Sequence, residues 1–422
     1  MTSSLTQLAR ALRDSRERTL FLVRDLQGAQ WLGPKLAIVN PPLWEIGHLA
    51  WFQEHWCLRN RDSGDPLLSI LPHADALYDS AKVAHDTRWN LPLPSLDKTL
   101  AYMQGVLERA CERIERGEIE YFAQLALFHE DMHGEAFAYT RQTHAYSSPA
   151  AFEAEKAGAW EGDVSVPGGE FMLGAEPQDG FVFDNEKWAH PVFVAPFAMS
   201  RAPVTNSQFL AFVEDGGYER EEFWDRAGWE WRSSENASAP VYWLKHNTLW
   251  LHRSYDAIEE LPLHAPVIHV NWYEAKAYCR WANRRLPTEA EWEFAAAQSS
   301  TEAKKRRYPW GDNLPAARHA ELDGRSWRCA EVAAHAEGDS AWGCRQMLGN
   351  VWEWTDSAFL PYPGFVADPY KEYSQPWFGD HKVLRGGCFA TRARLLRNTW
   401  RNFYTPDRRD VFAGFRTCAV KE

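Results

Sequence analysis

Cysteine is scarce in this chain of 422 residues, which has seven thiols and no Cys-x-x-Cys pair. The seven are odd in number and scattered along the chain, at positions 57, 111, 279, 329, 344, 388 and 418. This pattern argues against a disulfide framework and is typical of the reduced thiols of a cytoplasmic protein.

Long apolar runs and an excess of basic charge are also missing. Residues 1–26 are amphipathic and carry several arginines and aspartates, so they contain no stretch of signal-peptide or membrane length. The formal net charge is −12, whereas a nucleic-acid partner requires a basic patch that binds phosphates. We therefore expect a soluble, cytoplasmic protein that binds neither membranes nor nucleic acids.

Tryptophan, by contrast, is abundant, with 22 residues in a chain of ordinary hydrophobic content. Aromatic side chains at this density favour compact, loop-rich domains and pockets that hold organic ligands. A chain of 422 residues is also too long for one small core. We therefore expect two domains.

The first 146 residues have the periodicity of helices. Leucine and valine recur at helical spacing near the N-terminus, Pro41-Pro42 precedes an apolar run as a helix start signal, and another amphipathic run covers about 95–116. A further helix is predicted from the apolar spacing between 119 and 137. Four main helices joined by loops predict an antiparallel bundle over residues 1–146.

The remainder of the chain has a different pattern. Residues 147–162 are small and polar without periodicity, which predicts a linker. From 163 to 422, short apolar runs such as 171–173, 192–194 and 267–270 alternate with Gly, Pro and Asn clusters. Helical patterns interrupt them at 206–214, 272–284 and 288–297. The prediction is an irregular, loop-rich α+β domain.

Residues 128–135 (FHEDMHGE) carry two histidines, His129 and His133, four positions apart. On a helix these lie about 40° from each other, so their imidazoles can converge on one ion. For an isolated pair the alternative is two partly buried histidines bonded to neighbouring helices. A third histidine, His48, lies on an earlier apolar helix with similar aromatic neighbours. Three histidines from two helices favour a metal site with open positions for substrates.

The second half contains a series of motifs in a fixed order. They are 167–171 (PGGEF), 184–186 (DNE), 203–206 (PVTN), 285–293 (RLPTEAEWE), 308–311 (YPWG), 348–354 (LGNVWEW) and 385–387 (RGG). Together they resemble the formylglycine-generating-enzyme-like fold, a variant of the C-type lectin architecture. The first half resembles the DinB-type four-helix bundle. This pairing is similar to the nonhaem-iron sulfoxide synthases of ergothioneine and ovothiol biosynthesis and to the related selenoneine synthases.

Most of these motifs have structural interpretations. The double glycines at 168–169 and 386–387 are predicted to be turn residues with positive φ. Thr288 is predicted to cap a helix, with Glu291 completing a capping box. The Trp352/Trp354 pair is interpreted as scaffold. These residues identify the fold without carrying the chemistry.

The resemblance implies that His48, His129 and His133 hold Fe(II). A neutral set of three imidazoles suits a divalent first-row ion and leaves positions for the imidazole of hercynine, a chalcogen donor and O2. Glu135 lies about 200° around the helix from His133. Unless Gly134 bends the helix, Glu135 has a supporting role rather than that of a ligand.

Tyr362, in the stretch 360–365 (LPYPGF), matches the family's catalytic tyrosine, and a phenol is a suitable proton donor that stays protonated at neutral pH. The alternative is a surface tyrosine in a turn between prolines. Phe365 stands where some relatives carry a second tyrosine.

The stretch Arg401-Asn402-Phe403-Tyr404 matches a lining of the pocket for hercynine, the trimethylated betaine of histidine. Phe403 would supply a cation–π face and Asn402 hydrogen bonds. For most of the arginines between 392 and 416 the favoured interpretation is a solvated basic stretch.

The chalcogen donor is where this sequence departs from relatives that use γ-glutamylcysteine. Those relatives place an aspartate where this chain has Tyr404, and usually a glutamine where it has Met132. Loss of such polar contacts typically costs roughly 1–3 kcal/mol of discrimination. Arg88 remains as a charged contact, and Trp89 with Tyr404 would suit a donor rich in hydroxyls. The resemblance thus points to a selenoneine synthase that uses a selenosugar, and cysteine or γ-glutamylcysteine is the alternative donor.

Three other functions remain open. A formylglycine-generating oxidase needs a late pair of copper-binding cysteines, which Cys388 and Cys418, 30 residues apart, do not resemble. A DinB-type thiol transferase would not need the second domain. A noncatalytic lectin-like binding module would make the three histidines incidental.

Overall fold

The computed structural model describes residues 2–59, 68–150, 153–302 and 304–420. Contacts divide the chain into two compact units, Met1–Pro149 and Ala150–Glu422. Within the described residues no helix has both the length and the apolar character that crossing a membrane requires.

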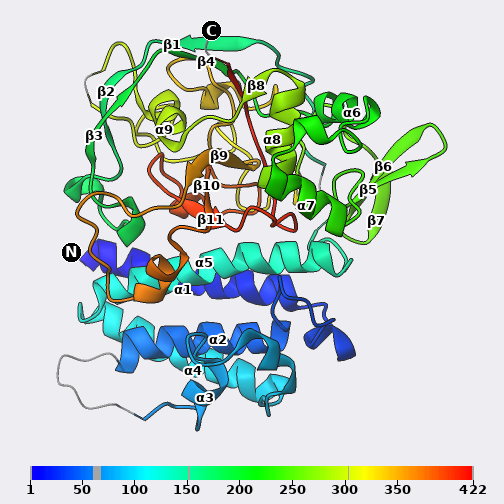
Figure 1. Ribbon diagram of the computed structural model, residues 1–422. Helices are drawn as coiled ribbons and strands as arrows, with labels where there is room; N and C mark the ends of the chain where they lie inside the picture. The colour runs from blue at the N-terminus through cyan, green and yellow to red at the C-terminus, as the bar shows by residue number, and fades with distance from the viewer. Residues whose placement is uncertain (1, 60–67, 151–152, 303, 421–422) are drawn as a thin grey trace. The chain divides into compact units, whose positions relative to one another are not determined.

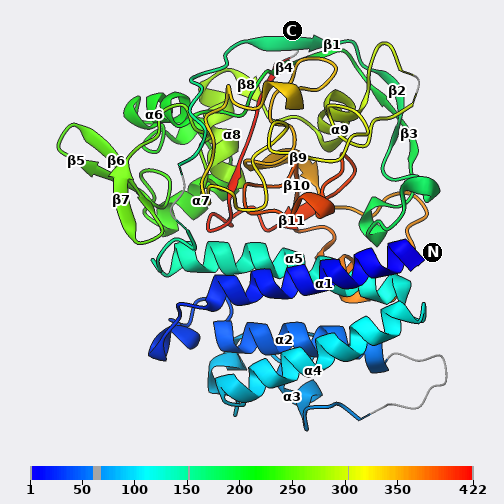
Figure 2. The same cartoon turned by 180° about the vertical axis from the view of Figure 1, so that it is seen from behind.

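The first unit is a bundle of four main helices, as the periodicity predicts (Figure 1). Helix α1 packs against α5 and α4, and α2 packs against α4 and α5. Both views show α1 beside α5 and α2 beside α4 (Figure 2). The helices of this unit are α1 (Thr2–Val23), α2 (Pro42–Glu54), α3 (Ala74–Tyr78), α4 (Leu96–Glu115) and α5 (Glu120–Thr143).

Helix α2 is buried along almost its whole length, because α3, α4 and α5 pack against it. Pro42 occupies its first turn, where the missing N–H costs nothing. The helix continues into a π-helical turn at His55–Arg59, a feature that often marks functional regions and that the periodicity does not predict.

Polar side chains fix α5 against α1. Arg16 donates to Glu130, with 2.7 Å between Nε and Oε1, and Ser15 donates to Asp131 at 2.8 Å. All four side chains are buried. Because Glu130 and Asp131 lie between His129 and His133, these bonds also fix the part of α5 that carries the two histidines.

The second unit contains four small sheets with helices around them. Strand orders are β1-β4-β13-β8, β11-β10-β9-β12, β2-β3 and β5-β6-β7. The strands are β1 (Asp163–Val166), β2 (Gly169–Leu173), β3 (His190–Val194), β4 (Phe197–Ser200), β5 (Trp243–His246), β6 (Leu249–Ser254), β7 (Ala257–Glu260), β8 (Arg284–Arg285), β9 (Trp352–Ala358), β10 (Lys382–Arg385), β11 (Asn402–Tyr404), β12 (Ala413–Gly414) and β13 (Cys418–Ala419). The helices are α6 (Asn206–Glu214), α7 (Arg226–Ser234), α8 (Trp272–Trp281) and α9 (Glu289–Ala297). The predicted α+β class is confirmed.

Two of the short apolar runs pair with each other, because β2 and β3 are antiparallel with Phe171 opposite Val192. The run 267–270 is largely buried but belongs to no strand. Its backbone groups are bonded individually, since Val267 N–H donates to the carbonyl of Val204 and the Trp354 indole donates to that of Val270.

The predicted turn glycines are confirmed. Gly168 and Gly169 have φ of +66° and +133°, and Gly386 and Gly387 have +102° and +79°. A Cβ on Gly168 would lie 2.1 Å from the carbonyl oxygen of Val194. Only glycine allows this approach of two backbone segments without rearrangement.

Helices α6 and α9 follow the sequence pattern closely. Thr288 accepts from the N–H of Glu291, and the Glu291 carboxylate accepts from the N–H of Thr288, which completes the predicted capping box. Helix α8 ends at Trp281, earlier than the predicted 284, because Asn283 has a φ of +51° and Arg284 enters β8.

The prediction that most arginines between 392 and 416 are solvated is wrong, because none of the seven is exposed: four are half-buried and three are buried. Arg397, Arg401 and Arg416 are 3%, 1% and 0% exposed. Each makes an ion pair with a buried glutamate, Arg397 with Glu186, Arg401 with Glu289 and Arg416 with Glu353. The buried partners come from distant segments, so the local sequence contains no signal for them.

Candidate active site

Three histidines of the first unit converge as predicted. His48 on α2 and His129 and His133 on α5 each offer a nitrogen, and the three nitrogens lie within 4.8 Å of one another. The Nε2 atoms of His48 and His129 are 3.3 Å apart. His48 and His129 are buried, whereas the side chain of His133 is 19% exposed. Access to the cluster is therefore on the side of His133.

The other ring nitrogens of two of these histidines are bonded to the protein. Nδ1 of His48 lies 2.8 Å from the carbonyl oxygen of Tyr78, and Nδ1 of His133 lies 2.6 Å from Oε1 of Glu45. Since a carbonyl or a carboxylate only accepts, each Nδ1 carries the proton and each Nε2 presents its lone pair. This is the arrangement in which imidazoles bind metals.

Burial keeps two of the three histidines, His48 and His129, in the neutral form. Burial lowers the pKa of His48 to about 3 and, together with the neighbouring His133, holds that of His129 well below its usual value. Neutral imidazoles are the form that ligates a divalent cation. The residues present therefore fit a metal ion held by three nitrogen ligands.

Aromatic rings pack on both sides of the cluster. Phe52 stacks on His129, with 3.6 Å between ring centroids, and Trp44 stacks on His48 at 5.0 Å. The guanidinium of Arg88 lies over the Trp44 ring, 4.0 Å from its centroid. The rings fix the orientation of two imidazoles and shield them from water.

Arg88 is buried, and burial lowers the pKa of its guanidinium to about 10. It donates to Asn40 Oδ1 at 2.6 Å and to the carbonyl of Val83 at 3.2 Å, and its Nε makes no hydrogen bond to a described residue. No carboxylate forms an ion pair with it within the described part of the chain. A buried cation of this kind has capacity for an anionic group.

The remaining predicted residues of the first unit have different environments. Met132 is half-buried on α5, between the two histidines in sequence. Trp89 donates to the carbonyl of Gly33 and contacts His85 edge to face. Glu135 is buried on an unbroken α5 and is not part of the histidine cluster.

Tyr362 lies in the second unit and is buried, not a surface turn residue. Its hydroxyl donates to Oε1 of Glu289 at 3.2 Å, and the Arg401 guanidinium lies 4.2 Å from the centroid of its ring. Glu289 also accepts from Arg385 and Arg401. Burial raises the pKa of the Tyr362 phenol well above its usual value, so the hydroxyl stays protonated.

The other predicted residues of the second unit are half-buried. Phe365 contacts Phe378 edge to face. Asn402 Oδ1 accepts from the N–H of Phe403, and Phe403 stacks on Phe359 with 4.0 Å between centroids.

The ring of Tyr404 lies 5.0 Å from the Arg408 guanidinium. Asn402, Phe403 and Tyr404 form strand β11, so Asn402 and Tyr404 lie on one face of the strand and Phe403 on the other.

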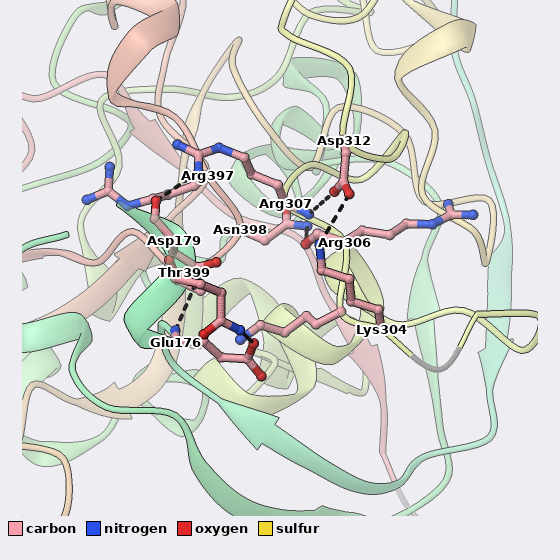
Figure 3. A pocket seen from close by; sticks show the side chains of 11 residues that line it. Glu176, Asp179, Lys304, Arg306, Arg307, Asp312, Arg397, Asn398 and Thr399 are labelled. Atoms are coloured by element: carbon pink, nitrogen blue, oxygen red, sulfur yellow. Dashed lines mark hydrogen bonds and ion pairs between the residues drawn. The ribbon is translucent and has the colours of Figure 1, made fainter. Parts of the chain in front are cut away.

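A cavity of about 240 Å³ lies elsewhere in the second unit (Figure 3). Its walls carry charges of both signs, including Lys304, Arg307 and Asp312, and Asp312 accepts from the backbone N–H of Arg307. None of the predicted site residues lines this cavity.

Sequence reasoning missed Glu45 and Glu289. Glu45 lies three residues before His48, hence on the same face of α2, which is a signal for contact with the histidine cluster. Glu289 belongs to the capped start of α9, and nothing local indicates that it contacts Tyr362.

All seven cysteines are free thiols, and six of them are buried. Burial raises the pKa of Cys418 to about 12, so its thiol is not poised for metal binding as a thiolate. No disulfide joins any two of the seven cysteines, in agreement with the expectation from their spacing that they form no disulfide framework.

Comparison with known proteins matches each unit to a protein family. Residues 11–137 match the DinB superfamily, and residues 135–421 match the sulfatase-modifying factor enzyme 1-like domain. A formylglycine-generating enzyme of Streptomyces coelicolor is 33% identical over 294 residues, covering 61% of this chain and 88% of that protein.

Two relatives extend over both units. A hercynine oxygenase of Mycolicibacterium thermoresistibile is 38% identical over 423 residues, covering 97% of this chain and 94% of that protein. A hercynine oxygenase of Mycobacterium tuberculosis is 38% identical over 424 residues, covering 98% and 99%. Because the match spans both units and nearly the whole of each relative, the chain belongs to the hercynine oxygenase family of oxidoreductases.

Proposed function

We propose that this protein is an Fe(II)- and O2-dependent enzyme that joins sulfur or selenium to the imidazole C2 of hercynine. The observation that carries the proposal is the cluster of His48, His129 and His133, in a chain 38% identical to hercynine oxygenases over almost its full length. Three imidazole nitrogens within 4.8 Å of one another suit a divalent first-row ion.

In this proposal the three histidines hold Fe(II), which supplies the activation of O2. Phe52 and Trp44 keep two of the imidazoles in place and exclude water from their faces. His133, the partly exposed member of the cluster, leaves a side open through which substrates approach.

Tyr362 is proposed as the proton donor. Its phenol carries its proton throughout the neutral range, and Glu289 holds the hydroxyl in one orientation. A positioned acid of this kind typically contributes 10²–10⁴-fold to a rate.

Hercynine carries a quaternary ammonium and a carboxylate. Phe403 is proposed to face the ammonium, since one side of its ring is covered by Phe359 while the side chain remains half-buried. The amide Nδ2 of Asn402 is a donor for the carboxylate, because its Oδ1 is already bonded to the backbone. Phe365 would add apolar surface.

For the chalcogen donor we propose a selenosugar, which would make the protein a selenoneine synthase. Tyr404 and Met132 are uncharged, and Trp89 adds a second aromatic ring, so these positions favour hydroxyls and apolar surface over a charged amino acid.

The alternative is an ergothioneine sulfoxide synthase that uses cysteine or γ-glutamylcysteine. The observation that favours it is Arg88, a buried guanidinium with a free Nε and no carboxylate partner among the described residues. A donor carboxylate would provide that partner.

A competition assay separates these functions. Full-length protein loaded anaerobically with Fe(II) is mixed with O2, hercynine and an equimolar set of a selenosugar, a thiosugar, cysteine and γ-glutamylcysteine. O2 consumption and the masses of the products are recorded, with histidine in place of hercynine as the control.

We expect hercynine-dependent O2 uptake and a product that contains selenium. A preference for either amino-acid thiol would exclude the sugar donor and leave a sulfoxide synthase. No hercynine-dependent O2 uptake with any donor would refute the reaction itself.

A further inference from the structure

Glu45 is a buried carboxylate in contact with the histidine cluster. It lies in the first turn of α2, three residues before His48, and is 1% exposed. Its Oε1 lies 2.6 Å from Nδ1 of His133 on α5. Helix α2 therefore contributes both a candidate ligand and the carboxylate that orients a ligand on the facing helix.

The contact fixes which nitrogen of His133 is available. A carboxylate can only accept, so Nδ1 carries the hydrogen and Nε2 keeps its lone pair. His48 is held in the same tautomer by the backbone carbonyl of Tyr78. The two contacts differ in charge, since Glu45 is a carboxylate and the Tyr78 carbonyl is neutral. A carboxylate makes its imidazole a stronger electron donor than a neutral carbonyl does.

Among the described residues, the charge of Glu45 has no lysine or arginine partner. Within the described residues its only ion-pair contact is with His133, and no lysine or arginine lies within 4 Å. Its negative charge does act on Arg88, whose pKa it raises against the larger effect of burial. A buried carboxylate is costly unless a cation compensates it. Three neutral imidazoles around a divalent ion leave two positive charges uncompensated, and Glu45 supplies one negative charge beside them.

We propose that Glu45 is a positioning residue of the metal centre, which fixes the tautomer of His133 and partly neutralises the bound ion. This inference rests on the proposed metal centre but not on the identity of the substrates. Its consequence is that Glu45 sets how tightly Fe(II) binds and how easily the bound iron is oxidised.

The test uses full-length protein and Fe(II) alone. Glu45→Gln keeps an oxygen that accepts from His133 but removes the charge, and Glu45→Asp keeps the charge but shortens the reach. Glu54→Gln is the matched control, since Glu54 is equally buried on α2 but bonds Ser69, Ile70 and Tyr102 and lies 3.9 Å from Arg59 Nε, away from the histidines. Circular dichroism and thermal unfolding establish that each variant is folded.

The Fe(II) dissociation constant is measured anaerobically by competition with a chromophoric chelator. For Glu45→Gln we expect an increase of about 10–100-fold, and a more positive Fe(III)/Fe(II) midpoint potential, because the removed charge stabilised the ferric state. Glu45→Asp is expected to weaken binding with a smaller change in potential. Glu54→Gln should match the wild-type protein in both measurements.

Wild-type affinity and potential in folded Glu45→Gln would overturn the inference. An equal loss in Glu54→Gln would also overturn it, because any buried charge would then have the same effect. If the wild-type protein binds no Fe(II), the metal centre fails and Glu45 has no such role. If the Glu45 effects appear but hercynine stimulates no O2 uptake, only the proposed reaction fails.

Discussion

At the scale of single residues, the histidines of α2 and α5 differ in whether their truncation leaves a buried cavity. His48 and His129 are buried beneath aromatic rings, so truncating either leaves a cavity, whereas His133 is partly exposed. His133 therefore offers the cleanest test of metal binding.

We predict that His133→Ala lowers Fe(II) affinity by at least about 100-fold, because losing a ligand costs more than losing a partner of a ligand. Iron content after anaerobic loading and desalting gives the measurement. His144→Ala is the control, since His144 ends the same helix and takes no part in the cluster. Full iron occupancy in His133→Ala would remove His133 from the ligand set.

Tyr362 gives a second prediction at this scale. Tyr362→Phe should bind Fe(II) as the wild type does but form the new bond about 10²–10⁴-fold more slowly, because only the step that needs a proton is affected. Oxidised donor without the new bond is the expected side product. Single-turnover product analysis measures both.

Tyr218→Phe is the matched control, because Tyr218 is another buried phenol that donates to a glutamate, Glu274. Loss of a buried hydrogen bond alone would slow both variants equally. Unchanged product ratios in Tyr362→Phe would show that the proton comes from another group.

At the scale of elements, helix starts in this chain are set by short local signals. The capping box of α9 joins Thr288 and Glu291 through reciprocal bonds. We predict that Thr288→Ala lowers the free energy of unfolding by about 1 kcal/mol and that Thr288→Ser restores most of it. Urea denaturation measures both, and an unchanged midpoint in Thr288→Ala would mean that tertiary packing alone fixes the helix start.

The same local signals explain how much of the fold was predictable. The four main helices of the bundle and α6, α8 and α9 follow from apolar spacing and capping residues. The histidine cluster follows from two histidines four apart together with His48 on an earlier helix. The ordered motifs identify the second unit, but its strands are two to seven residues long. Strands this short contain too few residues for an alternation of apolar and polar side chains to predict them.

What could not be predicted depends on contacts between distant segments. Arg401 and Glu289 are 112 positions apart, and Glu45 and His133 are 88 apart. A charged residue in isolation indicates a solvated surface. Only the fold provides the partner that makes burial of such a charge acceptable, so the local sequence does not predict the burial of Arg397, Arg401 and Arg416.

At the scale of the whole molecule, stability depends on groups held in one protonation state. Burial lowers the pKa of His269 to about 3, from an ordinary value of 6.5. Between these values the unfolded chain binds the proton and the folded chain does not, so stability falls as pH falls below 6.5. Glu274, with its pKa raised to about 7, acts in the opposite direction.

We therefore predict that His269→Asn removes part of the acid sensitivity, and asparagine suits the φ of +62° at this position. The difference in unfolding free energy between wild type and variant should shrink by about 2 kcal/mol from pH 6.5 to pH 5. Glu274 is present in both proteins, so its contribution to the pH dependence cancels in the difference between them. A constant difference across this range would show that His269 binds its proton as readily in the folded state as in the unfolded chain.

Buried ion pairs also affect the stability of the whole molecule. Arg416 and Glu353 are both fully buried, with 2.6 Å between Nε and Oε2. We predict that Arg416→Met lowers the free energy of unfolding by about 3–5 kcal/mol, because it leaves a buried carboxylate without its partner. Arg226→Met, at an exposed pair with Glu230, is the control and should cause no measurable change. Equal midpoints for the two variants in urea would contradict the prediction.

These buried pairs also restrict how such a sequence can change over evolutionary time. Replacing Arg416 or Glu353 alone passes through a destabilised intermediate, whereas replacing a buried pair together with apolar side chains is often neutral or stabilising. A stable sequence with the pair and a stable sequence without it are therefore connected only through a single substitution that lowers stability. In descendants of this chain, the two positions are expected to be retained together or exchanged together, even though the pair itself adds little to net stability.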